Sequence, residues 1–358
     1  MVKSLFAGII ILLAFGLIML SSAGIIDAQK KFGSPYYYVY HQFLFSILPG
    51  LGLLFLFSRI NYKLWKKLAM PILFMALVAM ILVFIPRFGY GLRGATRWVN
   101  LFDITFQPSE FLKLALVIYL AAWFGGNDRR ISHLQYGIFP FLVVMSFVGA
   151  LLVLQPDIGT LLVVMTVALA VYLFAGASLK HFSMIILAAV LVVGVLIMIE
   201  PYRINRIKAF LDPSIDPHGI SYQINQSLIA IGSGGVFGVG FGHSTQKLGF
   251  LPEVVGDSIF AVIAEELGLV GAMLTLGLYL FLCILLIRTA RAADDDFGKL
   301  FVLGITVWII GQALLNMAAM SGIAPLTGIP LPLISYGGTS TLIILTGLGI
   351  ALNIARKT

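Results

Sequence analysis

The segment LPEVVGDSIFAVIAEELGLVG, residues 251–271, decides how this chain folds, because it combines a long apolar run with three carboxylates. Asp257 stands where a polar loop enters the run, and Glu265 and Glu266 lie inside it. A carboxylate at the centre of a lipid bilayer costs roughly 2.5–3.5 kcal/mol on insertion scales. We therefore expect these groups either to take part in chemistry or to pair with cations inside a bundle of helices.

The composition is that of a membrane protein. The 358 residues are 60% hydrophobic and only 11% charged, and their mean hydropathy is +1.04, which excludes a soluble enzyme and a disordered chain. The sequence predicts an all-α polytopic membrane protein, with residues 1–358 as one membrane domain. About ten apolar runs approach the roughly 20 residues that cross a bilayer. These runs lie at about 4–24, 39–57, 68–85, 108–124, 136–154, 158–177, 182–199, 258–287, 299–318 and 338–355.

The positive-inside rule orients these runs, because Lys and Arg are enriched in short cytoplasmic loops. With ten spans both termini lie on one side, and the basic residues place that side in the cytoplasm. The long loop of about 200–256, between the seventh and eighth spans, is then extracytoplasmic. The basic residues expected inside are Lys3, Arg59, Lys63, Lys66, Lys67, Arg129, Arg130, Lys180, Arg288, Arg291, Lys299, Arg356 and Lys357, and those in short outer loops are Lys30, Lys31, Arg87, Arg93 and Arg97.

Three outer segments are expected to converge on one cavity. The loop 200–256 contains YQINQSLIAIG (222–232), whose helix-like spacing of apolar residues predicts an interfacial helix, and a glycine-rich turn region follows at 232–242. The segment 322–340 contains three prolines and cannot continue a helix. The segment 87–110 is short, aromatic and basic. Non-helical backbone at membrane depth is tolerated where it lines a cavity.

The three carboxylates of the opening segment are expected to differ in role. Asp257 is either an N-cap of the eighth span or a general base that faces the outer cavity. At about 1.5 Å per residue, Glu265 and Glu266 are expected to lie roughly 12 Å deeper than Asp257. They are therefore interpreted as structural groups that pair with buried cations or cap a neighbouring broken helix.

Basic residues near the outer segments are candidates for binding an anionic head group. Arg97 and Lys113 are two of them, and Lys113 follows Glu110 at a spacing that also allows a local ion pair. Snorkelling towards the interface is the alternative explanation. Further basic residues of the long loop support the head-group hypothesis. They are Arg203, Arg206, Lys208 and Lys247.

Other polar positions are interpreted as supports. Gln155 and Asp157 form a tight turn in which Asp157 caps the next span, and Gln312 and Asn316 share one face of the ninth span and are expected to bond between helices. The histidines make no zinc pattern, the single cysteine offers no disulfide, and the glycine-rich run is not a P-loop. One carboxylate with several cations suits a transfer reaction whose leaving group is an anion.

At these positions the chain resembles the SEDS family of bacterial membrane proteins, which comprises the FtsW and RodA proteins. The resemblance covers about residues 90–355. Its motifs are GATRWVNLFDITFQPSEFLKLALVIYLA (94–121), LQPDIGT (154–160), FLDPSIDPHGISYQINQSLIAIGSGG (210–235), STQKLGFLPE (244–253), DSIFAVIAEELGLVG (257–271) and PLTGIPLPLISYGGTS (325–340). The resemblance implies a ten-span fold and a peptidoglycan glycosyltransferase that polymerises lipid II on the outer face of the bacterial cytoplasmic membrane.

The resemblance also implies roles for particular residues. Asp257 would be the catalytic base, and Arg97, Lys113 and Lys247 would contact the diphosphate. A divalent cation, Mg²⁺ or Mn²⁺, is compatible with that task, although the sequence shows no dedicated ligand cage. The residues expected to support the site are Glu110, Gln155, Asp157, Glu265, Glu266 and Ser335.

The implied partners are a class B penicillin-binding protein, which is a transpeptidase, and other membrane proteins of the divisome; no nucleic acid is expected. The sequence is more similar to the division branch (FtsW) than to the elongation branch (RodA). The alternatives are an elongation polymerase of the RodA type, a lipid II flippase and a scaffold for division proteins. Gly256 and Ser258 depart from the T-D-F that the family usually has around this aspartate.

Overall fold

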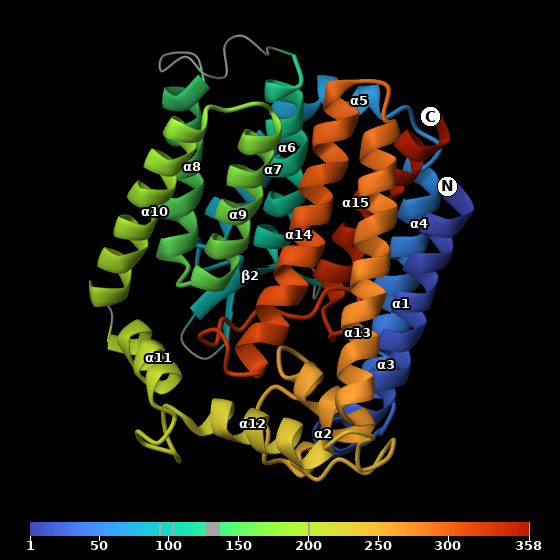
Figure 1. Ribbon diagram of the computed structural model, residues 1–358, viewed down its shortest axis with the longest axis vertical. Helices are drawn as coiled ribbons and strands as arrows, with labels where there is room; N and C mark the ends of the chain where they lie inside the picture. The colour runs from blue at the N-terminus through green and yellow to red at the C-terminus, as the bar shows by residue number, and fades with distance from the viewer. Residues whose placement is uncertain (93–94, 102–103, 127–136, 200, 358) are drawn as a thin grey trace.

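The structure is a computed structural model that describes residues 1–92, 95–101, 104–126, 137–199 and 201–357. It is a bundle of long helices, with both chain termini at one end and the 200–256 segment at the other (Figure 1). We call these the terminus end and the loop end. Arg93 of the short outer loops lies outside the described residues, as do Arg129 and Arg130, which were expected inside.

The first half of the chain supplies helices that run back and forth between the two ends. Their bounds are α1 (Val2–Ala23), α2 (Ile25–Phe32), α3 (Tyr37–Gln42), a π-helical turn (Phe43–Ile47), α4 (Leu48–Phe57), α5 (Lys63–Lys67), α6 (Ala69–Leu82), α7 (Pro108–Phe124), α8 (Phe139–Leu154) and α9 (Ile158–Phe174).

The second half holds the long loop and the most buried helices. Its elements are α10 (Leu179–Ile199), α11 (Pro201–Leu211), α12 (Tyr222–Gly234), a 3₁₀ turn (Gln246–Leu248), α13 (Ile259–Ala292), α14 (Asp296–Met320) and α15 (Gly338–Lys357). The helix expected at 222–232 is therefore present as α12, and the segment from 322 to 337 is not helical, as its prolines predicted.

The expectation of a polytopic helical membrane protein is confirmed. In the described part of the chain, five helical segments are long and apolar enough to cross a membrane, and four shorter apolar helices accompany them. The long segments are Val2–Ala23, Tyr37–Phe57, Ile259–Ala292, Asp296–Met320 and Gly338–Lys357, and the shorter ones are Ala69–Leu82, Phe139–Leu154, Ile158–Phe174 and Leu179–Val195. Helices suit this environment because all their backbone polar groups bond internally.

The centre of the bundle is α14, which packs against α7, α9, α13 and α15 (Figure 1). Its side chains Phe297, Phe301 and Trp308 are fully buried. By contrast, the middle of α10 exposes most of its large apolar residues, as expected for a helix at the rim of the bundle that faces lipid. The candidate site described below lies at the loop end of this central helix.

The all-α prediction missed a small antiparallel sheet. Its strands are β1 (Gly89–Leu92), β2 (Ala95–Leu101) and β3 (Ile104–Phe106), in the order β1-β2-β3. The register of the sheet is given by Val99 of β2, which pairs with Gly89 of β1 on one side and with Phe106 of β3 on the other. The sequence suggested only a loop here, since strands of three to seven residues give too short an alternation to stand out from an aromatic and basic segment.

Helix α13 is broken at Gly268, which has φ 68° and ψ −160°. The segment 235–240, which we call the glycine loop, bonds to the broken turn through four backbone hydrogen bonds. They are Val239 N to Glu265 O (3.0 Å), Gly240 N to Glu266 O (3.1 Å), Leu269 N to Gly235 O (2.9 Å) and Val270 N to Val236 O (3.2 Å). The backbone N–H and C=O groups at these positions are therefore hydrogen-bonded despite the break in the helix.

Glu266 and Asp257 make their contacts with different parts of the bundle. Glu266 bonds to Ser22, which is next to the last residue of α1 at the loop end. Asp257 is tied through Asn316 to Ile329, in a segment that packs beside the middle of α1, where a Cβ on Gly16 would lie 2.6 Å from Leu333 O. The break lies beyond both glutamates, so residues 259–267 remain one helical stretch, and the greater depth of Glu265 and Glu266 stays a prediction.

Candidate active site

Asp257 lies in the turn that precedes α13, but it does not cap the helix. The N-cap position is Ser258, and no side-chain cap bond is made there. The Asp257 carboxylate instead accepts a long hydrogen bond from Gln223 Nε2 (3.3 Å) and another from Ser258 Oγ (3.5 Å). The N-cap interpretation is therefore wrong, and the carboxylate is only weakly bonded.

The backbone around Asp257 is held firmly by two neighbouring segments. Asn316 Nδ2 donates to Asp257 O and to Ile329 O, both at 2.8 Å. Ser335 Oγ donates to Gly256 O (2.6 Å) and accepts from Leu331 N (2.8 Å). Ser335 therefore acts as a clamp between the 251–258 turn and the 322–337 segment, so that a loosely bonded carboxylate stands on a rigid backbone.

Arg206, on α11, approaches the same place from the long loop. Its Nη1 donates to Leu326 O at 2.7 Å. A Cβ built on Gly328 would lie 3.8 Å from Arg206 Nη2 and 3.8 Å from Asp257 Oδ2, so one point in space touches both groups. Gly328 has φ +69°, which glycine adopts without strain.

The environment raises the pKa of Asp257 to about 6. Burial is the main cause, because a carboxylate loses hydration, and the charge of Glu253 adds to it. The hydrogen bond from Gln223 and the charge of Arg206 act in the opposite direction. A carboxyl with such a pKa is ionised at neutral pH and is still basic enough to accept a proton.

Lys113 and Glu110 form a buried ion pair at 2.8 Å on α7. Lys113 Nζ also donates to Gln312 Oε1 at 2.9 Å, and Gln312 Nε2 donates to Pro330 O at 2.9 Å. The pair is thus linked through Gln312 to the segment that frames Asp257. Gln312 thus bonds between helices, as expected, through Lys113 of α7, whereas Asn316 bonds to backbone carbonyls of two non-helical segments, Asp257 O and Ile329 O.

Arg97 lies on β2 and bonds to the turn between α8 and α9. It donates to Gln155 O (3.4 Å) and to Pro156 O, and its Nη1 lies 3.9 Å from Asp157 Oδ1. Asp157 caps α9, as expected, by accepting from Thr160 N (3.2 Å). Gln155 Nε2 donates to Met80 O (2.9 Å). Arg97 therefore braces this neighbouring turn.

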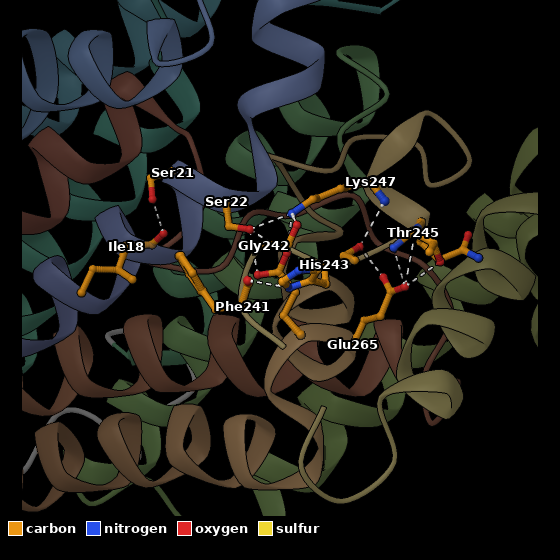
Figure 2. Close-up of polar contacts among 12 residues, drawn as sticks. Ile18, Ser21, Ser22, Phe241, Gly242, His243, Thr245, Lys247 and Glu265 are labelled. Atoms are coloured by element: carbon orange, nitrogen blue, oxygen red, sulfur yellow. Dashed lines mark hydrogen bonds and ion pairs between the residues drawn. The ribbon is translucent and has the colours of Figure 1, made fainter. Parts of the chain in front are cut away.

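Lys247 is buried in a closed network at the loop end of α1. Its ammonium donates to Glu266 Oε1 (2.6 Å), Gly242 O (2.8 Å) and Ser22 Oγ (2.9 Å). Ser22 Oγ donates in turn to Glu266. Figure 2 shows Ser22 and Lys247 meeting beside Gly242. All three donors of the ammonium face groups of the protein, so the pairing of Glu266 with a buried cation is confirmed.

Glu265 holds the neighbouring turn. It accepts from Ser244 Oγ, from Thr245 N (2.9 Å) and Oγ1 (3.0 Å), and from Gln246 N (3.4 Å) (Figure 2). These amides open the 3₁₀ turn Gln246–Leu248, so the carboxylate satisfies donors that have no partner within the turn. Glu265 thus caps a neighbouring 3₁₀ turn, where the sequence suggested the cap of a broken helix.

The structure therefore divides the expected site residues into groups. Asp257 and Ser335 lie together, and Glu110 and Lys113 connect to them through Gln312. Arg97, Gln155 and Asp157 lie together at the turn between α8 and α9. Lys247, Glu265 and Glu266 belong to a separate buried polar network of the long loop, which we call the loop network. Around Asp257 the structure adds Gln223, Glu253 and Gly328 and makes Arg206 a neighbour. Each stands inside a quoted motif or the long basic loop, but nothing in the sequence measures its distance from Asp257.

These features define a polytopic helical membrane protein with one weakly bonded carboxylate where two loops meet. The family model of the FtsW, RodA and SpoVE proteins, described as "Cell cycle protein", matches residues 3–358. The chain therefore belongs to this family, the SEDS family that its motifs indicated.

Relatives and solved structures agree with this assignment. The "Probable peptidoglycan glycosyltransferase FtsW" of Trichlorobacter lovleyi is 40% identical over 347 residues, which cover 97% of this chain and 91% of that protein. A chain of a peptidoglycan synthase complex, described as coordinating polymerization and crosslinking, matches with a TM-score of 0.81 and 31% identity, over 99% of this chain and 97% of that one. Thermus thermophilus RodA, a rod shape determining protein, matches with a TM-score of 0.72 and 28% identity, over 99% and 96%.

Proposed function

We propose that this protein is a peptidoglycan glycosyltransferase of the division type, which polymerises lipid II into glycan strands. Membership of the family and the 40% identity to a relative named FtsW support the activity and the division branch. The observation that carries the proposal is Asp257, a carboxylate with a pKa of about 6 on a clamped backbone. It is the group whose position suits a general base.

In the proposed reaction, Asp257 accepts the proton of the 4-hydroxyl of the acceptor's N-acetylglucosamine. The oxygen attacks the anomeric carbon of the donor's N-acetylmuramic acid with inversion. The bond from that carbon to the diphosphate breaks, and undecaprenyl diphosphate leaves with the electron pair. A diphosphate is already a good leaving group, so a second carboxyl is not needed as general acid, unlike in ordinary glycoside hydrolysis.

Mg²⁺ or Mn²⁺ fits this site only as an ion shared with substrate. Among the residues that the structure describes, no group of three or more His, Cys, Asp or Glu side chains gathers as a metal site. Asp257 and Glu253 are close enough for their charges to interact, and Mg²⁺ is commonly held by one or two carboxylates together with substrate phosphates. The bound ion would supply charge neutralisation at the diphosphate.

The proposed topology has ten crossings of the bacterial cytoplasmic membrane, with residues 1–358 as one membrane domain. Both termini are cytoplasmic, and the loop end with Asp257 is extracytoplasmic. The common location of the termini and the basic residues of the terminus end support this orientation (Figure 1). Lipid II would then be polymerised on the outer face.

We expect the partner to be a class B penicillin-binding protein, with other divisome membrane proteins around the pair. The matching chain of a peptidoglycan synthase complex supports this expectation. The partner would crosslink the glycan that this protein makes.

The geometry gives no support to a flippase. A transporter would expose polar groups along a path through the bundle, whereas Glu265, Glu266, Gln312 and Asn316 each bond to neighbouring groups of the protein. Such closed bonds suit a fixed framework. A polymerase needs only one accessible face, and the loop end that holds Asp257 would provide it.

The test is polymerisation of lipid II by the purified protein with its class B partner. Asp257→Asn keeps the shape of the side chain and removes the base, and we expect a loss of about 10²- to 10⁴-fold in rate. Asp212→Asn, an exposed aspartate of the same loop, is the matched control and should retain the wild-type rate. A wild-type glycan yield from folded Asp257→Asn would end the proposal.

A further inference from the structure

We propose that the glycine loop inserts into the leaflet at the loop end, the outer leaflet in the proposed orientation, where Val236, Phe237 and Val239 contact lipid. The lipid surface is then the partner of a face of the long loop that the proposed glycosyl transfer does not use.

The glycine loop exposes apolar side chains where a water-facing loop would carry polar ones. Phe237 is 83% exposed, and Val236 and Val239 are exposed as well. Residues 234–242 read GGVFGVGFG and contain no polar or charged side chain. An exposed apolar patch of this kind indicates contact with a membrane or with another protein.

The apolar surface of the loop continues onto α13. The backbone bonds from Leu269 and Val270 to the loop place these two residues beside it. Both side chains are exposed, as is Met273 one turn further along the helix. Because α13 is long and apolar enough to cross a membrane, this exposed side belongs to a surface at hydrocarbon depth.

Helix α1 gives a first measure of the depth of the loop. Cations are costly in the hydrocarbon layer, so the exposed Lys3 marks the boundary of that layer at the terminus end. At about 1.5 Å per residue, the helical rise from Lys3 to Ser22 is roughly 28 Å. Ser22 bonds to Glu266, whose carbonyl accepts from Gly240 N of the loop. The loop therefore lies at the far edge of a layer that is about 30 Å thick.

Helix α13 gives the same depth independently. Arg288 is exposed near its end at the terminus end of the bundle. The part of the helix beyond the break rises roughly 28 Å from Arg288 to Leu269, at about 1.5 Å per residue. Leu269 N donates to Gly235 O of the loop at 2.9 Å. Both helices thus place the loop where acyl chains meet head groups, the depth at which interfacial segments bury their apolar side chains.

The backbone of the loop is also suited to this depth. Non-helical backbone near hydrocarbon must bond within the protein, because water is scarce there. Besides the bonds to the broken turn, Gly238 N donates to Gly234 O (2.7 Å), and His243 N donates to Gly240 O (3.1 Å). The φ angles of +80° at Gly238 and +105° at Gly240 permit this folded path.

Lipid fits this surface better than a folded partner protein does. A protein interface has a polar rim around its apolar centre. Residues 234–242 supply no polar side chain for such a rim, and the adjoining face of α13 is apolar.

The test is the accessibility of a nitroxide spin label on the full-length protein in lipid nanodiscs. Oxygen concentrates in lipid, whereas a water-soluble nickel chelate does not enter it. In a Cys283→Ser background, which has no other cysteine, labelled Phe237→Cys should favour oxygen as strongly as Met273→Cys on α13. His218→Cys, an exposed position of the same long loop, is the water-facing control and should show a several-fold lower ratio of oxygen to nickel accessibility.

A label at position 237 with the accessibility of His218→Cys would overturn the inference. Adding the class B partner should leave the ratio at 237 unchanged. Loss of access to both reagents on adding it would assign the surface to the partner and would also overturn the inference. If Phe237→Cys does not fold, Val239→Cys repeats the measurement. No glycan synthesis is needed for these readouts, so failure of the proposed function would leave them as they are.

Discussion

Asp257 and Glu266 lie in one short segment, yet the fold surrounds them differently. Glu266 accepts from a lysine and a serine at 2.6–2.8 Å, and Glu265 next to it accepts from four donors. Asp257 accepts two bonds of 3.3 and 3.5 Å. Full satisfaction stabilises a charge and makes it inert, whereas weak bonding with burial keeps a carboxylate basic. The comparison separates the glutamates of the loop network, which stabilise the fold, from Asp257, which we propose as the catalytic base.

The largest effect on stability should come from removing the ion pair between Lys247 and Glu266 in the loop network. Glu266→Gln or Lys247→Met leaves its partner as an unpaired buried charge, and we expect a loss of about 3–5 kcal/mol in the free energy of unfolding. Thermal unfolding in detergent measures it. Lys247→Met combined with Glu266→Met removes both charges and should recover much of the loss; a double variant no more stable than either single one would contradict the pairing.

The next effect should come from the break in α13. A Cβ on Gly268 would lie 2.3 Å from Gly238 N and 2.5 Å from Val236 O, and φ is +68°. We expect Gly268→Ala to cost about 2–4 kcal/mol, from strain and overpacking together. Gly277→Ala, in the same helix with open space around it, is the control. Equal unfolding temperatures for the two variants would argue against a fixed break.

The smallest effect should be a shift in pH dependence. Activity needs ionised Asp257, so the acid limb of kcat/KM should fall near pH 6, the value to which burial and Glu253 raise its pKa. Glu253→Gln removes the like charge and should move the limb to lower pH. Burial, the larger cause, is unchanged, so the limb should stay above the ordinary value of 3.8. A limb that does not move would show that another group titrates.

Much of this architecture could be predicted from the sequence, because apolar runs and basic loops report directly on membrane crossing. The short strands were missed, since three to seven residues give little periodicity. The break at Gly268 was not predicted, because the left-handed φ of this residue depends on the glycine loop that packs against it.

The candidate site was predictable in part. Asp257 could be singled out because a carboxylate beside a membrane span is costly unless it is paired or functional. The structural roles of Glu265 and Glu266 were inferred from their separation from Asp257 along the helix. The choice among cations could not be made, since Lys113, Lys247 and Arg206 look alike until their partners are known. Tertiary contacts that join residues far apart in the chain decide which cation pairs with a buried glutamate and which lies near Asp257.

The most direct test of the account measures lipid II polymerisation and thermal unfolding on the same preparations of Asp257→Asn and Glu266→Gln. The pKa of Asp257 is raised in the fold, so this group favours the folded state at low pH, and that contribution is lost as the pH rises from about 4 to 6. Asp257→Asn should therefore unfold no earlier than wild type at pH 7 while losing polymerisation. Glu266→Gln should unfold earlier but still polymerise below its melting temperature. Active Asp257→Asn, or inactive Glu266→Gln with wild-type stability, would contradict the account.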